Sequence, residues 1–192
     1  MQKIKIGVSG NKGSFSEEAT LYYCQKKEIT DFELYYLIGS ENALRSVTSG
    51  EVDLAIFPLE NSNGGMVLES VHAMSNYVFG IDDIFEIDVK HNLLVKKGAK
   101  TDDITKVVSH PQALKQCRMY LRRVWGNVEL EEYTDTASAA KDLSLGILEK
   151  NCAVIAPRIC SELYGLDILE ENIQDLKFNY TSFLAATKKN KI

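Results

Sequence analysis

The sequence lacks an excess of basic residues, closely spaced cysteine pairs and long apolar runs, which nucleic-acid-binding, zinc-binding and membrane-spanning proteins respectively require. Its 192 residues carry a formal net charge of -5 at pH 7, which disfavours binding to nucleic acid or to an anionic membrane. No uncharged run approaches the roughly 18 residues of a membrane-spanning helix. The chain enters an alternating strand pattern at once, without the apolar core of a signal peptide, so we expect a cytoplasmic protein. These absences favour a small-molecule partner.

Sites for metals and dinucleotides are not expected either. The four cysteines form no C-x-x-C pair, so neither a zinc site nor a redox motif is indicated. His72 and His91 have no partners at metal-ligand spacing. The glycines at positions 7, 10 and 13 do not form G-x-G-x-x-G. With only three prolines and no low-complexity segment, the chain also shows no flexible linker.

Apolar residues switch repeatedly between a period of two and a period of 3.6, which is typical of alternating strands and helices. The sequence therefore predicts the α/β class, in two lobes that pack directly. Strands are expected at 3–8, 32–38, 52–58, 107–108, 128–133, 152–155 and 179–187, with two extended segments across 84–95. Helices are expected at 14–25, 42–48, 66–74, 111–124, 136–145 and 158–164.

Polar residues gather at four loop or strand-to-helix positions: Lys12–Ser16, Glu60–Ser62, Ser109–Gln112 and Thr134–Thr136. Strand carboxyl ends border the ligand crevice of open α/β sheets, and helix N-termini offer free N–H groups to anions. This placement suits a ligand that carries carboxylates. Each cluster taken alone is also explained as a helix N-cap.

Five segments carry a family resemblance. Gly13-Ser-Phe-Ser-Glu-Glu-Ala19 is similar to the motif G-T-F-S-E-x-A, and Pro58-Leu-Glu-Asn-Ser-Asn-Gly-Gly-Met-Val67 to P-x-E-N-S-x-x-G-x-V. Ser109-His-Pro-Gln-Ala-Leu-Lys-Gln-Cys117 and the helix start Thr136-Ala-Ser-Ala-Ala140, similar to T-A-x-A-A, follow in order. Asn179-Tyr-Thr-Ser-Phe183 is similar to N-x-T-R-F. In this order the segments resemble the prephenate dehydratase family over almost the whole chain.

The resemblance implies conversion of prephenate to phenylpyruvate with loss of carbon dioxide and water, a step of phenylalanine biosynthesis that needs no cofactor. It gives Thr181 the role of hydrogen-bond or proton donor to the departing hydroxide. Glu60 would orient its neighbours, carry a proton, or act as a structural turn carboxylate. The expected substrate-binding residues are Ser14, Asn61, Ser62, Ser109, Gln112, Thr136, Ala137, Asn179 and Phe183. For His110, which precedes a proline at a helix start, we expect a structural role.

One residue departs from the family pattern. Ser182 stands where the family has arginine, and serine cannot reproduce the paired charge-assisted hydrogen bonds of a guanidinium group to a carboxylate. Lys12 is the candidate replacement cation, or else a solvated turn lysine. The alternatives are therefore a close variant acting on arogenate, a prephenate decarboxylase that does not expel hydroxide, and a noncatalytic binder of small carboxylates.

The resemblance also implies an architecture. We expect two α/β lobes with the active-site cleft between them, similar to type II periplasmic binding proteins, and closure of the lobes during the cycle. The first lobe would comprise residues 1–76 and 168–192, and the second residues 77–167. We expect no regulatory ACT domain in this polypeptide, and the resemblance suggests a homodimer.

Overall fold

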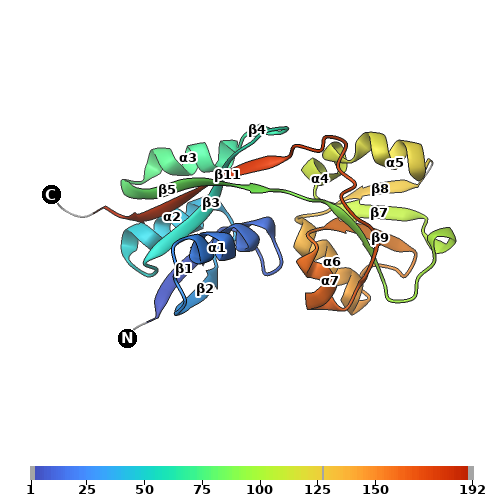
Figure 1. The fold of residues 1–192 in the computed structure, drawn as a ribbon, viewed down its shortest axis with the longest axis horizontal. Helices are drawn as coiled ribbons and strands as arrows, with labels where there is room; N and C mark the ends of the chain where they lie inside the picture. Colours follow the sequence, from blue (N-terminus) through green and yellow to red (C-terminus); the bar gives the residue numbers. More distant parts are fainter. Residues whose placement is uncertain (1–2, 127, 190–192) are drawn as a thin grey trace. The chain divides into compact units, whose positions relative to one another are not determined.

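The computed structural model describes residues 3–126 and 128–189, and the chain forms two compact units. Unit 1 comprises residues 1–88 and 180–192, and unit 2 comprises residues 89–179. Each unit holds one β-sheet, which confirms the expected α/β class (Figure 1). No helix in the described ranges is both long enough and apolar enough to cross a lipid bilayer.

Unit 1 is built on a sheet with the strand order β2-β1-β3-β11-β5, to which β4 is added beside β3. Its strands are β1 (Ile4–Val8), β2 (Phe32–Tyr36), β3 (Leu54–Asn61), β4 (Gly65–Met66), β5 (Phe79–Asp88) and β11 (Tyr180–Lys188). β1 runs parallel to β2 and β3, whereas β11 runs antiparallel to β3 and β5. In Figure 1 the last strand, in red, lies between the teal β3 and the green β5.

Three helices cover the two faces of the unit 1 sheet: α1 (Phe15–Lys26), α2 (Ser40–Ser49) and α3 (Leu68–Asn76). α2 and α3 pack on the face that presents Phe57 and Leu184. α1 packs on the opposite face, where Tyr23 lies against Phe85 with ring centroids 5.4 Å apart. The Glu69 carboxylate of α3 accepts a hydrogen bond from Ser40 N at 2.9 Å, so one helix satisfies a free N–H at the start of the other.

Unit 2 is built on a sheet with the strand order β10-β6-β9-β7-β8. Its strands are β6 (Asn92–Val95), β7 (Lys106–Ser109), β8 (Glu129–Glu132), β9 (Cys152–Ala156) and β10 (Asp167–Glu170). β7 runs parallel to β8 and β9, and β6 runs antiparallel to β9 and β10. A short 3-10 turn, η1 (Thr101–Asp103), precedes β7.

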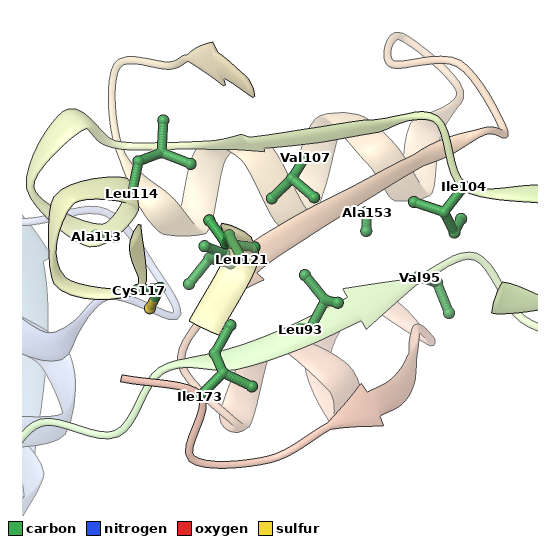
Figure 2. Packing of buried hydrophobic residues seen from close by; sticks show 11 residues of the cluster. Leu93, Val95, Ile104, Val107, Ala113, Leu114, Cys117, Leu121, Ala153 and Ile173 are labelled. Atoms are coloured by element: carbon green, nitrogen blue, oxygen red, sulfur yellow. The ribbon is translucent and has the colours of Figure 1, made fainter. Parts of the chain in front are cut away.

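The helices of unit 2 are α4 (Pro111–Gln116), α5 (Arg118–Val124), α6 (Thr136–Leu145) and α7 (Ile159–Tyr164). α4 and α5 cover one face of the sheet, and Figure 2 shows Leu114, Cys117 and Leu121 gathered over Leu93 and Val107 of the strands. α6 and α7 cover the other face, where alanines of α6 pack against β9. Each unit is therefore a sheet between two layers of helices.

The expected element positions hold for most of the chain, with two local differences. The single helix expected at 111–124 is two helices, because the Asp175 carboxylate accepts hydrogen bonds from Met119 N and Tyr120 N, both at 2.8 Å, and so begins a second helix after Cys117. The strands β4 and β10 were not expected. β4 has only two residues, too few to show a period of two, and β10 is defined by its pairing with the distant β6.

The division of the chain also differs from the expected boundaries near residues 76 and 168. β5 belongs to unit 1 because it pairs with β11 from Phe79 to Asp88. β10 belongs to unit 2 because it pairs with β6. The chain therefore passes from one unit to the other between Asp88 and Val89, and returns between Asn179 and Tyr180.

Candidate active site

Thr181 lies near the start of β11, where its neighbours across the sheet are Asn61 of β3 and Ile87 of β5. The side chain is buried, and its Oγ1 accepts a hydrogen bond of 2.8 Å from Asn61 Nδ2. A hydroxyl has one proton to donate and two lone pairs. Among the described residues, Thr181 Oγ1 accepts this hydrogen bond and donates none, so its proton is available to a bound molecule.

Asn61 and Ser62 join the turn after β3 to the start of β11. Asn61 Oδ1 accepts hydrogen bonds from Asn63 N at 2.9 Å and from Gly64 N at 2.8 Å. Ser62 N donates to Tyr180 O at 2.8 Å, and Ser62 Oγ accepts from Tyr180 N at 3.0 Å. Asn61 Nδ2 also donates to Tyr180 O at 3.3 Å. Asn61 and Ser62, which are expected to bind substrate, therefore also hold the backbone of Tyr180.

Glu60 and Ser182 lie on the face opposite Thr181. Alternate residues of a strand point to opposite faces, and β11 places Ser182 in the row of Leu184, on the side of α2 and α3. Ser182 pairs with Glu60 on one side and with Glu86 on the other, and its Oγ donates to Glu86 Oε1 at 3.1 Å. The structure therefore separates Glu60 from Thr181, although the two residues come from neighbouring strands.

Phe183 returns to the face of Thr181, but it is 2% exposed and belongs to the core. Its ring stacks on Phe85 with centroids 6.2 Å apart, and Phe85 in turn contacts Tyr23 of α1. This packing occupies the ring with neighbouring aromatic side chains. In this structure Phe183 is therefore a core residue and does not offer a surface to a ligand.

Ser14 and Lys12 lie in the loop between β1 and α1. Ser14 is the N-cap of α1, because its Oγ accepts from Glu17 N, while the Glu17 carboxylate accepts from Gly13 N and from the Tyr36 hydroxyl. The Ser14 hydroxyl thus caps α1, but the pair is not a full capping box, because Ser14 N donates to Asn11 O and the Glu17 carboxylate binds the N–H one residue earlier. Lys12 is exposed beside it.

In unit 2, the expected residues gather at one edge of the sheet. Ser109 ends β7 and pairs with Glu132, at the end of β8, so the helices that follow both strands start at the same edge. Gln112 lies in the first turn of α4, where its N–H donates to His110 Nδ1 at 3.2 Å. The expected structural role of His110 thus has a geometric basis, because the side chain caps the helix.

Not all of these residues present a side chain to solvent. Ser109 is fully buried, and its hydroxyl donates to Ile155 O at 2.6 Å within the sheet. Thr136 is half-buried at the first position of α6, whose N-cap is Asp135. Ala137 is buried in the core beneath it. Of this group, Gln112 and Thr136 retain partly exposed side chains.

Asn179 is part of a buried polar network that sequence reasoning did not detect. Its Nδ2 donates to Val89 O at 3.1 Å and to Gln116 Oε1 at 3.0 Å, while Val89 N donates to Asn179 O at 2.7 Å. The same Gln116 oxygen lies 2.7 Å from Nε2 of His91, a buried residue. Burial lowers the pKa of His91 and so favours the neutral ring. Isolated histidines and glutamines carry no sequence signal for such a network.

Several known proteins are similar to this chain. The sequence model of the family described as "Prephenate dehydratase" matches residues 6–191. The "Bifunctional chorismate mutase/prephenate dehydratase" of Stutzerimonas stutzeri is 33% identical over 183 residues, which are 95% of this chain and 48% of that protein. "Arogenate dehydratase 1" of Petunia hybrida is 32% identical over 186 residues, 97% of this chain and 42% of that protein. The chain thus spans about half the length of these relatives.

A solved structure shows the same fold. The chain superposes on prephenate dehydratase of Arthrobacter aurescens, solved in complex with L-Phe, with a TM-score of 0.85 and 24% identity. The match covers 98% of this chain and 61% of that chain.

Proposed function

Because this chain belongs to the prephenate dehydratase family, we propose that it converts prephenate to phenylpyruvate with loss of carbon dioxide and water, in phenylalanine biosynthesis. The ring carboxylate leaves as carbon dioxide, and the electron pair of that bond enters the ring. The bond between the opposite ring carbon and its hydroxyl breaks, and the departing hydroxide takes up one proton to become water. The ring becomes aromatic, which drives the step without an external oxidant.

The observation that carries the proposal is the uncommitted proton of Thr181. Hydroxide is a poor leaving group, so a donor aimed at the departing oxygen lowers the barrier. The Thr181 hydroxyl accepts a hydrogen bond from the Asn61 amide and donates none to a described residue. Its proton can therefore form a hydrogen bond to the hydroxyl of the substrate. A threonine hydroxyl is a weak acid, and it therefore acts as a prealigned hydrogen-bond donor rather than as a free proton source.

Substrate binding completes the proposal. Prephenate carries two carboxylates. The first turn of α6 offers backbone N–H groups beside Thr136, and Gln112 offers its partly exposed side-chain amide at the start of α4. We include both residues, with Lys12 and Ser14 of unit 1, as carboxylate contacts. Arogenate, which differs from prephenate in its side chain, is a second substrate of the same class, and one of the similar proteins is named for it.

The first test is an assay of the purified protein with prephenate and, separately, with arogenate, in which products are identified by absorbance and mass. We expect phenylpyruvate or phenylalanine from the parent, and a fall in kcat of about 10²- to 10⁴-fold for Thr181→Ala. Thr181→Ser, which keeps the hydroxyl, is the matched control and should lose much less.

Other outcomes would reject the proposal in different ways. A decarboxylated product that keeps its hydroxyl would identify a non-aromatising decarboxylase. Binding of prephenate without turnover would identify a noncatalytic binder. Equal activity of the parent and Thr181→Ala would remove Thr181 from the mechanism.

A further inference from the structure

The orientation of the Asn61 side-chain amide is determined by its surroundings. Asn61 Oδ1 lies 2.9 Å from Asn63 N and 2.8 Å from Gly64 N, and both of these backbone groups are donors. An amide nitrogen cannot accept a hydrogen bond, so the oxygen of Asn61 must face the turn and the nitrogen must face β11. The nitrogen then lies 2.8 Å from Thr181 Oγ1 and 3.3 Å from Tyr180 O.

This orientation decides where the Thr181 proton points. Because Asn61 Nδ2 donates to Thr181 Oγ1, the hydroxyl cannot direct its own proton back toward Asn61. Donation to a hydroxyl also polarises its O–H bond and so strengthens the hydrogen bond that it donates in turn. The orientation of the Asn61 amide therefore directs the Thr181 proton away from Asn61 and strengthens the hydrogen bond that Thr181 can donate.

The turn that carries Asn61 is held against β11 at a second point. Ser62 exchanges two hydrogen bonds with Tyr180, at 2.8 Å and 3.0 Å, so the distance between the Asn61 amide and Thr181 is fixed by backbone as well as by side-chain contacts. Such support gives the geometry that a positioned donor requires.

We propose that Asn61 is a positioning residue, which acts on the reaction by holding the Thr181 proton toward the substrate instead of binding the substrate itself. This inference rests on the proposed function, and it replaces the substrate-binding role that the sequence alone suggests for Asn61. It predicts that reversing the direction of a single hydrogen bond, with no change of side-chain size, disables the donor.

The decisive variant is Asn61→Asp. The introduced carboxylate still accepts from Asn63 N and Gly64 N, so the turn should persist, but it has no proton for Thr181 Oγ1. The Thr181 hydroxyl then donates to the carboxylate and no longer to the substrate. We expect kcat to fall about 10²-fold, with KM changed by less than about threefold, because the lost interaction belongs to the transition state.

The pH profile separates this role from a merely structural one. Asn63 N, Gly64 N and the Thr181 hydroxyl all donate to the introduced carboxylate and hold its pKa below the ordinary aspartate value of about 4. As the pH falls toward this lowered pKa, the carboxyl gains a proton and can donate to Thr181 Oγ1 again. The kcat of Asn61→Asp relative to the parent should therefore rise with acidification. Asn42→Asp, in the first turn of α2, makes the same chemical change in a half-buried residue away from Thr181 and should follow the parent at every pH.

A thermodynamic cycle and a spectroscopic measurement complete the test. In a Thr181→Ala background, Asn61→Asp should cause no further loss of activity, because the Thr181 hydroxyl on which it acts has already been removed. Without any substrate, carbon NMR can titrate the carboxyl introduced at position 61. Its pKa should rise when Thr181→Val is added, because the hydroxyl that stabilises the carboxylate is removed.

The outcomes keep this inference apart from the proposed function. A parent protein that dehydrates neither prephenate nor arogenate rejects the proposed function, while the NMR titration still tests the hydrogen bond. An active parent with an equally active Asn61→Asp rejects the positioning role. A raised KM with unchanged kcat would instead return Asn61 to direct substrate binding.

Discussion

Ser182 lies in a row of three side chains that crosses the unit 1 sheet from Glu60 of β3 to Glu86 of β5. The family pattern has an arginine at this position, and the sequence alone suggests that its loss removes a carboxylate contact of the substrate. The structure points to a different role for the position. A cation at 182 would lie between two glutamates, on the face opposite Thr181.

Ser182→Arg tests this reading of the position. We expect a gain in stability of about 0.2–1 kcal/mol for each new cross-strand ion pair, measured by urea unfolding. The kcat/KM for prephenate should change by less than about threefold, because the guanidinium group faces away from Thr181. Ser182→Ala serves as the control for loss of the hydrogen bond to Glu86. A tenfold or larger rise in kcat/KM would show that the arginine reaches the substrate after all.

At the scale of elements, the α4–α5 segment shows how a distant residue divides a helix. The apolar pattern from 111 to 124 is continuous, so the sequence predicts one helix, but the Asp175 carboxylate lies at the N-terminus of α5. Cys117, at the break, still packs in the core with Leu114 and Leu121 (Figure 2). A negative charge at a helix N-terminus also interacts favourably with the helix dipole.

Removal of this cap should destabilise unit 2. Asp175→Ala deletes both acceptors for Met119 N and Tyr120 N, and we expect it to lower the free energy of unfolding by about 0.5–2 kcal/mol. Asp175→Asn retains one acceptor and should lose less. Asp102→Ala, which removes an exposed acid from η1, is the control for net charge. Chemical denaturation curves would contradict the prediction if Asp175→Ala and Asp102→Ala gave the same midpoint.

The polar network around Asn179 predicts a dependence of stability on pH. Burial lowers the pKa of His91 in the folded state, so between the ordinary value of about 6.5 and the lowered value the unfolded chain binds more protons. Stability should therefore fall as the pH decreases below about 6.5, by up to about 1.4 kcal/mol per pH unit. Burial is the largest cause of this shift; the Gln116 amide oxygen, 2.7 Å from Nε2, raises the pKa in the opposite direction but does not cancel it.

His91→Gln should abolish this part of the acid sensitivity, because it removes the titrating group and keeps a hydrogen-bonding side chain. His72→Gln, on the exposed side of α3, is the matched control and should retain the slope of the parent. Urea unfolding at a series of pH values between 7.5 and 5 checks both variants. Parallel curves for the parent and His91→Gln would mean that His91 does not drive the loss.

At the scale of the whole molecule, the sequence predicts the α/β class and nearly every long element, because periodicity and caps are local signals. β5 and β10 pair with strands that are distant in the sequence, which a local pattern does not reveal. The boundaries expected near 76 and 168 therefore precede the observed ones, after Asp88 and after Asn179. The motif residues were identified by resemblance, but the opposite faces of Glu60 and Thr181 follow only from strand register. The cleft between two lobes stays a prediction.

The position of β11 has a consequence for the order in which the molecule can form. Unit 2 is a continuous segment, so it can fold as soon as residues 89–179 have been synthesised. The sheet of unit 1 cannot be completed until later, because β11, which lies between β3 and β5, is synthesised after the whole of unit 2. That strand also carries Thr181. We therefore expect that the pairing of β11 with β3 and β5 also brings Thr181 to Asn61. The protein should have no activity before this sheet is complete.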